Sequence, residues 1–439
     1  MNTAGTSQTG GHASLDDVLN QITTTSSSSS LNQYLKSFAP KESRDTILAS
    51  TLSSGQDPLS VLDPRSNTLG FLYILSARLH SASSPTPPLS VIEEFCSQFD
   101  PEQARLAPDR VTFLAKGIVR ASENSNNAKY AITSLYNLVT RYPPDLSYLT
   151  TLHAIFLKTC VATRHFTTAL PVLAVPITSV DTTLSDLHYN DNLVYHYSGG
   201  IALGALKRWR EAEEFFEICV SAPAQVPAAI QLEAYKKLAL VQLIQYGETV
   251  NLPKYTHPSL TRMFKGSACG AFVKLYPTQV DTLRNFVSKE QETFTQERTL
   301  GLINQAIERA PVWLIKKLTA TYLTLGLADI GREVGINNVE DVRSIILDMI
   351  DSGEINATIS ADDTVTFADV VSQFSKEDLD RVLVQAQEQN RVLLKVERAI
   401  NASRDYLTKA LKSKDDAGWG LEEDMFPPGM GSGTTWAED

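Results

Sequence analysis

The sequence of 439 residues lacks the features of a disulfide-stabilised or membrane-spanning protein. It has four cysteines, Cys96, Cys160, Cys219 and Cys269, which stand far apart with no Cys-x-x-Cys pair. We therefore expect buried free thiols and no zinc site. No apolar run reaches the roughly 20 residues that span a bilayer, and residues 1–30 show no basic-then-apolar signal pattern. We expect a protein of the cytoplasm and nucleus that makes no membrane contact.

Motifs for catalysis are also missing. The sequence contains no Gly-x-x-x-x-Gly-Lys-Ser/Thr loop and no His-Glu-x-x-His, and its seven histidines are scattered. Residues 429–433 are glycine-rich, but no strand precedes them and no helix follows, so we interpret them as a linker. Residues 266–270 could resemble a nucleophile turn, yet they have no adjacent histidine, and Cys269 is better explained by helix packing. We predict no catalytic residues, no cofactor and no metal ligands.

Basic residues are too few for a chain that binds nucleic acid. The net charge is −11, and residues 415–439 contain seven acids and no Lys or Arg, so the remainder carries −4. A mildly acidic body has the wrong sign for contact with a phosphate backbone. We expect no nucleic-acid partner, and residues 413–439 are predicted to form a flexible acidic tail.

What the sequence does contain is helical periodicity. Residues 1–30 are rich in Gly, Ser and Thr and are predicted to form a disordered head. Over residues 31–310, apolar residues recur at helical spacing between proline-containing joints roughly every 20 to 40 residues. This pattern predicts an α-solenoid of tetratricopeptide-like repeats.

One helix pair carries the repeat pattern clearly. Gly200, Leu203, Ala212 and Phe216 alternate small and large residues at the spacing of a tetratricopeptide-like pair, in which small residues permit close helix contact. His196 departs from this pattern, because a large apolar residue is usual there. Lys236 and Lys237, further along the chain, are expected on a solvated helix face.

Residues 311–370 change the pattern and predict a winged helix. Apolar residues from Trp313 to Ile330 follow a helical period, and a second helix covers roughly 339–350. Ser352-Gly353 ends that helix, and the period then becomes two, which predicts a two-stranded wing. A strand edge can be extended by a second winged helix. The residues predicted to build this interface are Ile355, Ala357, Ile359, Val365 and Phe367. The fold class is therefore mostly α.

A long amphipathic helix is predicted over residues 377–412. Apolar residues recur at seven-residue intervals, with a second row interleaved between them. A helix of 36 residues is roughly 54 Å long, at about 1.5 Å per residue, and a small winged helix alone cannot cover it. We expect its stripe to enter a bundle with partner helices. The residues of this bundle interface are Leu379, Ala386, Leu393, Val396, Ile400 and Leu407.

A winged helix that binds DNA is the more specific alternative to one that binds proteins. The candidate recognition helix, residues 337–344, offers one arginine against two acids. The predicted wing carries Asp362 and Asp363 where phosphate contacts would need Lys or Arg. The charge pattern favours a winged helix that binds proteins. An enzyme has no motif to support it.

The order of these parts resembles the PCI family, whose members combine helical repeats with a winged helix. Residues 322–367 resemble the core PCI pattern, and other blocks resemble the subunit 3 family of the COP9 signalosome over roughly residues 55 to 412. These blocks are Leu62–Pro64 with Thr68–Gly70, Ser198–Gly200, Leu232–Lys237, Leu252–Thr256 and Glu292–Thr295. The blocks Leu232–Lys237 and Leu252–Thr256 are the most specific. A PCI subunit of the proteasome lid or of translation initiation factor 3 is the alternative within this class.

The resemblance implies a non-catalytic scaffold subunit in a hetero-oligomer. In this family, winged helices associate side by side and C-terminal helices enter a shared bundle. The complex removes the ubiquitin-like modifier NEDD8 from cullin–RING ligases, and its metalloprotease site belongs to another subunit. Subunits 1 and 8 are the implied neighbours, and no cofactor is implied for this chain.

Overall fold

A computed structural model describes residues 14–81, 85–368 and 375–409 of the chain. It divides into two compact units, residues 1–367 and residues 368–439, and each is described by itself. The first unit contains helical repeats followed by a small mixed module, and the second contains a long helix. Within the described residues, no helix is both long enough and apolar enough to cross a membrane.

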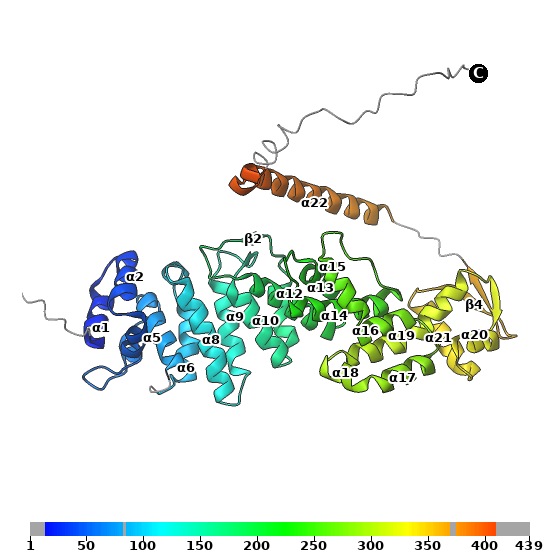
Figure 1. The fold of residues 1–439 in the computed structure, drawn as a ribbon, viewed down its shortest axis with the longest axis horizontal. Coiled ribbons are helices and arrows are strands. Elements are labelled where there is room, and N and C mark those ends of the chain that lie inside the picture. The colour runs from blue at the N-terminus through cyan, green and yellow to red at the C-terminus, as the bar shows by residue number, and fades with distance from the viewer. Residues whose placement is uncertain (1–13, 82–84, 369–374, 410–439) are drawn as a thin grey trace, which may run out of the picture. The chain divides into compact units, whose positions relative to one another are not determined.

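The first part of unit 1 is a series of short helices that pack on their neighbours in the sequence (Figure 1). Its helices are α1 (Leu15–Thr24), α2 (Ser28–Ser37), α3 (Lys41–Leu48), α4 (Pro58–Val61), α5 (Thr68–His80), α6 (Leu89–Gln98), α7 (Pro101–Ala104), α8 (Pro108–Asn124), α9 (Tyr130–Arg141), α10 (Thr151–Ala162), α11 (Phe166–Leu173), α12 (Tyr189–Ala205), α13 (Trp209–Ser221) and α14 (Ala229–Tyr246). A short parallel pair, β1 (Tyr148–Leu149) and β2 (Ser179–Val180), lies beside them. Contacts between sequence neighbours are typical of an α-solenoid, as predicted.

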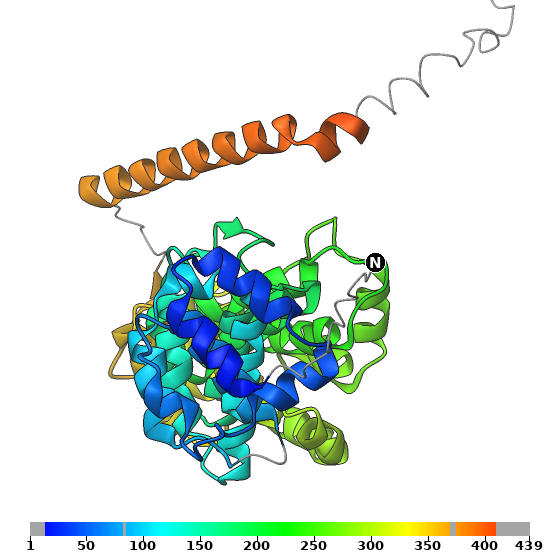
Figure 2. The same cartoon turned by 90° about the vertical axis from the view of Figure 1, so that its left-hand side faces the viewer.

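The prediction of a disordered head is wrong for residues 15–30. Helix α1 begins at a capping box in which the Ser14 hydroxyl accepts from the Asp17 N–H and the Asp17 carboxylate accepts from the Ser14 N–H. Its apolar face, with Leu15, Val18 and Ile22, is buried in the first core. Figure 2 shows α1 and α2 at the near end of the unit. Residues 1–13 lie outside the described residues.

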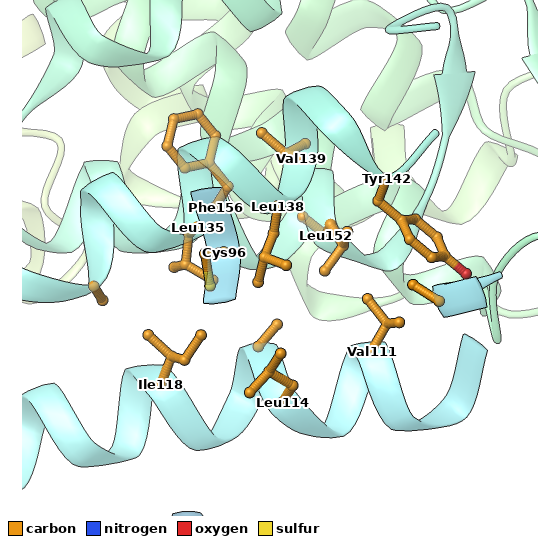
Figure 3. Close-up of a cluster of buried hydrophobic side chains, with 14 of the residues drawn as sticks. Cys96, Val111, Leu114, Ile118, Leu135, Leu138, Val139, Tyr142, Leu152 and Phe156 are labelled. Carbon is orange, nitrogen blue, oxygen red and sulfur yellow. The ribbon is translucent and has the colours of Figure 1, made fainter. Parts of the chain in front are cut away.

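The first core of unit 1 is one continuous cluster of buried side chains, and large aromatic side chains such as Tyr142 and Phe156 belong to it. Around Leu114, side chains from α6, α8, α9 and α10 meet in one layer (Figure 3). Cys96 lies in this layer, completely buried. The labelled residues there are Cys96, Val111, Leu114, Ile118, Leu135, Leu138, Val139, Tyr142, Leu152 and Phe156.

The tetratricopeptide-like pair lies where the spacing predicts it, in α12 and α13. A side chain added at Gly200 would meet the Phe216 ring at 2.7 Å, so only glycine permits this helix contact. His196 is buried in the same pair, and its Nδ1 is 2.9 Å from the Asn192 carbonyl oxygen. Burial lowers the pKa of the His196 imidazole, so the ring packs as a neutral group.

The second part of unit 1 has its own core. Its helices are α15 (Pro258–Lys265), α16 (Ala268–Leu275), α17 (Val280–Lys289), α18 (Gln291–Gln296) and α19 (Leu300–Thr319). Helix α14 joins the two cores, because Val241 belongs to the first cluster and Leu240 to the second. Helix α19 runs through the boundary that we predicted at residue 310.

The winged-helix module comprises β3 (Thr324–Gly326), α20 (Leu327–Val334), α21 (Val339–Asp351), β4 (Asn356–Ile359) and β5 (Thr364–Ala368). The sheet has three strands in the order β3-β5-β4, not the two predicted. Strand β3 pairs antiparallel with β5, with Leu325 opposite Val365. Leu325 was assigned to a helical face because it continues that spacing, but the pairing with β5 takes precedence over the local pattern.

Unit 2 contains α22 (Lys376–Ala402), a helix of 27 residues. At about 1.5 Å per residue it is about 40 Å long. The predicted single helix over residues 377–412 is therefore too long. Ser403 has an extended backbone, with φ −70° and ψ 140°, and residues 404–409 are helical again. Residues 410–412 and the predicted tail, 413–439, lie outside the described residues.

Candidate interaction surfaces

The sheet of the winged-helix module has two open edges, formed by β3 and β4. Strand β5 lies between them and pairs with both. Each outer strand therefore presents backbone N–H and C=O groups on one side that no strand of the described chain pairs with. Such an edge can accept a strand from another protein.

The side chains predicted to form the winged-helix interface belong to the core of the module. Ile355, Ala357, Val365 and Phe367 are buried against α20 and α21, and Ile359 is half-buried. Successive side chains of a strand point to opposite faces, so the apolar row that marked these residues is the inward row. The residues that point outward between them are polar, namely Asn356, Thr358 and Thr366. Contact with a partner at this sheet would therefore use the backbone edge and the polar row.

Charge on α21 is dominated by acids. The helix contains one basic residue, Arg343, whose guanidinium pairs with the Asp363 carboxylate in the β4–β5 turn and lies 3.6 Å from Glu340. Asp363 has φ 61°, a left-handed conformation that suits a tight turn. The one cation of the candidate recognition helix is thus already engaged by carboxylates of the module itself.

Helix α22 presents the predicted apolar stripe with no residue buried within its own unit. Leu393 is 64% exposed, and Leu379 and Ile400 are each 50% exposed. Ala386 and Val396 are also exposed on this helix, and Leu407 is exposed in the segment that follows Ser403. Further exposed apolar side chains, Leu383, Val384, Val392 and Leu394, widen the apolar surface beyond the predicted stripe.

The cysteine of the glycine-rich turn is a packing residue. Cys269 is completely buried in α16, with its Sγ 3.7 Å from the Lys236 carbonyl oxygen. Burial raises the pKa of the Cys269 thiol to about 12, so it stays protonated and is a poor nucleophile. All four cysteines are buried free thiols, as predicted.

Comparison with known proteins gives matches over nearly the whole chain. Residues 28–260 match the family described as COP9 signalosome complex subunit 3, N-terminal helical repeats, and residues 283–369 match the PCI domain. The chain is 31% identical over 373 residues to COP9 signalosome complex subunit 3 of Dictyostelium discoideum, which covers 81% of this chain and 88% of the relative. It is 29% identical over 431 residues to the Drosophila melanogaster protein of the same name, covering 92% and 96%.

The chain belongs to the COP9 signalosome subunit 3 family. The structure shows what one block that resembles this family does here. Within Leu232–Lys237, Lys236 and Lys237 are buried, which corrects our expectation of a solvated face. The Lys236 ammonium lies 2.8 Å from Glu233 and 2.7 Å from Glu297, a residue just after α18. In this subunit 3 family member, the buried Lys236 ammonium and its two partly exposed carboxylate partners therefore link the repeat helices to the second core.

Burial and hydrogen bonding act in opposite directions on Lys236. Burial alone would lower the pKa of its ammonium, but hydrogen bonds from that ammonium to Glu233 and Glu297 outweigh burial and raise it. Lys237 lies 3.6 Å from Glu233 and 5.3 Å from the centre of the Tyr197 ring. Sequence spacing identifies the Glu233 contacts, at i,i+3 and i,i+4, but gives no sign of Glu297.

The other specific block of the family, Leu252–Thr256, is a loop between α14 and α15. Its turn is closed by a hydrogen bond from the Thr256 N–H to the Pro253 carbonyl oxygen, at 2.9 Å. Tyr255 is 72% exposed, so the loop holds an aromatic side chain in solvent. No group of three His, Cys, Asp or Glu side chains within the described ranges could hold a metal ion.

Proposed function

We propose that the chain is a non-catalytic scaffold subunit of the COP9 signalosome. In this role it supports assembly of the complex that removes NEDD8 from cullin–RING ubiquitin ligases, in the cytoplasm and nucleus. Family membership supports the assignment to the complex. The observation that carries the scaffold role is α22, a 27-residue helix whose apolar stripe is unburied within its unit.

An exposed apolar stripe of this length needs a protein partner. Leu379, Leu393 and Ile400 are each half-exposed or more, and full burial of such a side chain stabilises an assembly by about 1.5–3 kcal/mol. The seven-residue spacing suits packing against other helices. We therefore assign α22 and the segment after it to a helical bundle shared with other subunits.

The open sheet edges support a second contact, with the winged helix of a neighbouring PCI subunit. Strand addition requires free backbone groups, which β3 and β4 offer. Subunits 1 and 8 are the proposed neighbours. A PCI subunit of another complex would use the same two surfaces, so the partners themselves must be identified.

The first experiment is gentle purification of the tagged full-length chain from its native cell, with mass spectrometry of stoichiometric partners. We expect the metalloprotease subunit, other signalosome PCI subunits and cleavage of NEDD8 from cullin. Recovery of proteasome-lid or ribosome-associated partners would leave the fold assignment unchanged but would assign the chain to a different complex. A monomer would contradict the scaffold role.

A pair of variants then tests the stripe. Leu393→Asp with Ile400→Asp should weaken incorporation into the complex by about a hundredfold or more, since two side chains that would be buried become charged. The matched control, Lys395→Gln with Arg398→Gln, changes the net charge by the same amount on the polar side of α22. Thermal unfolding of the solenoid should be unchanged in both. Normal incorporation of the aspartate variant would exclude α22 from the bundle.

A further inference from the structure

A groove of about 680 Å³ lies where the first and second cores of unit 1 meet. Its walls come from α10, α12, α13, α14 and α19, together with Arg298 in the turn before α19. Helix α14 contributes side chains to both cores. It therefore forms a wall of the groove and also connects the first core to the second. A molecule bound here would contact both cores at once.

Small side chains line much of the groove and leave backbone accessible. They include Ala162, Ser198, Gly204, Ala205 and Gly301. Larger apolar side chains, among them Val194, Ile201 and Leu302, also line the groove. A surface of this kind fits an extended segment with apolar side chains, in the way that helical-repeat proteins bind peptides in their grooves.

Three cations line the groove, and no acid does so among its described lining residues. Lys158 and Arg298 are exposed, and neither has an ion-pair partner in the described chain. Lys237 is buried, and its ammonium forms only a long ion pair, 3.6 Å, with Glu233. The charged side chains that line the groove are therefore all basic, in a chain whose net charge is −11.

The all-basic lining is specific to the groove. A smaller hollow of about 330 Å³ shares Lys158 and Val194 with the groove, but it is also lined by Lys116, Glu123 and Asp191. Among the described residues, the charged lining of the hollow is therefore two cations and two acids, whereas that of the groove is three cations and no acid.

We propose that this groove binds an extended segment of a partner protein that carries one phosphoserine or phosphothreonine between apolar residues. A phosphate carries close to two negative charges at neutral pH, which matches two unpaired cations and a third that is only partly paired. The guanidinium of Arg298 can donate two parallel hydrogen bonds to a phosphate, and the ammonium groups of Lys158 and Lys237 add charge. The small side chains allow the backbone of the segment to approach the helices closely.

The test uses the full-length chain and three pools of fluorescent nine-residue peptides. The pools share degenerate apolar flanks and differ at the central position, which is phosphoserine, serine or glutamate. We expect the phosphoserine pool to bind about tenfold or more tightly than the serine pool, and binding to weaken as salt rises from 50 to 300 mM. Lys158→Gln with Arg298→Gln should weaken this binding about tenfold or more.

The control is Lys289→Gln with Arg284→Gln, which removes two exposed cations from α17, outside the groove, and should change binding less than about twofold. Both double variants should unfold thermally like the parent chain, because none of the four side chains is buried. Equal binding of the serine and phosphoserine pools would overturn the proposal. Equal binding of the glutamate pool, or displacement by a peptide of residues 413–439, would overturn the phosphate requirement, because carboxylates would then suffice.

Discussion

The buried histidine His153 should make the solenoid sensitive to mild acid. Its ring is completely buried in α10, and burial lowers its pKa from 6.5 to about 4. Well above pH 6.5 the ring is neutral in folded and unfolded chains, so pH has no effect through it. Between pH 6.5 and 4 the unfolded chain takes up a proton that the folded chain does not, so stability falls as pH falls.

The size of the effect follows from the two pKa values. A shift of one pKa unit corresponds to about 1.4 kcal/mol, so complete titration costs about 3 kcal/mol, and the loss at pH 5 is about 2 kcal/mol. His153 also caps its helix, because its Nδ1 accepts the Thr150 N–H at 3.2 Å. The variant His153→Gln keeps an acceptor at this position, in the Thr-x-x-Gln arrangement of a capping box, and removes the titrating ring.

Hydrogen exchange of the α10 amides at pH 7.5 and pH 5, corrected for intrinsic rates, measures the local opening free energy. In the parent chain it should fall by about 2 kcal/mol more than in His153→Gln over this interval. The control is His257→Gln, which removes a histidine from the start of α15 and should leave the response of α10 unchanged. Equal pH responses in the parent and His153→Gln would refute the reasoning, even if the variant is less stable at both pH values.

Two further predictions concern stability and use thermal unfolding of the full chain. Lys236→Met should destabilise the connection between the first and second cores by about 2–3 kcal/mol. This is below the usual cost of breaking a buried ion pair because Glu233 and Glu297 are partly exposed. Adding Glu297→Gln should recover part of the lost stability, and no recovery would argue against the pairing. Gly200→Val should cost about 1–3 kcal/mol by overpacking against Phe216, whereas Gly301→Ala, with open space at its Cβ, should be neutral or stabilising. An equal loss in both glycine variants would contradict the close-contact argument.

Helical periodicity identified most of the fold because each solenoid helix packs on its sequence neighbours. The spacing of Gly200 and Phe216 is local, and so is the change to a period of two after Ser352. Local signals also existed for α1, where Ser14 and Asp17 form a capping box before Val18 and Ile22, but the polar composition of residues 1–30 outweighed them in our prediction. Composition is a weaker guide than capping and periodicity for a short helix.

Features that depend on distant contacts could not be predicted. Strand β3 exists because Leu325 lies opposite Val365, 40 residues further along the chain. Lys236 is buried because Glu297 meets its ammonium, and that pair spans 61 residues. An alternating strand pattern gives two rows of side chains without saying which row faces the core, so the sequence did not show that most of the row assigned to the interface is buried in the module.

The apolar rows of the winged-helix module and of α22 look alike in the sequence but differ in whether the structure buries them. In the winged-helix module the apolar row has α20 and α21 to cover it, and Val365 is completely buried. In α22 no residue is buried, so the described part of its unit does not cover the row, and Leu393 remains 64% exposed. Three or more such side chains left in water forgo several kcal/mol of burial, at about 25 cal/mol per Å². A helix that keeps this surface through 27 residues is stabilised most by a partner, so we propose that assembly depends on α22 more than on the wing.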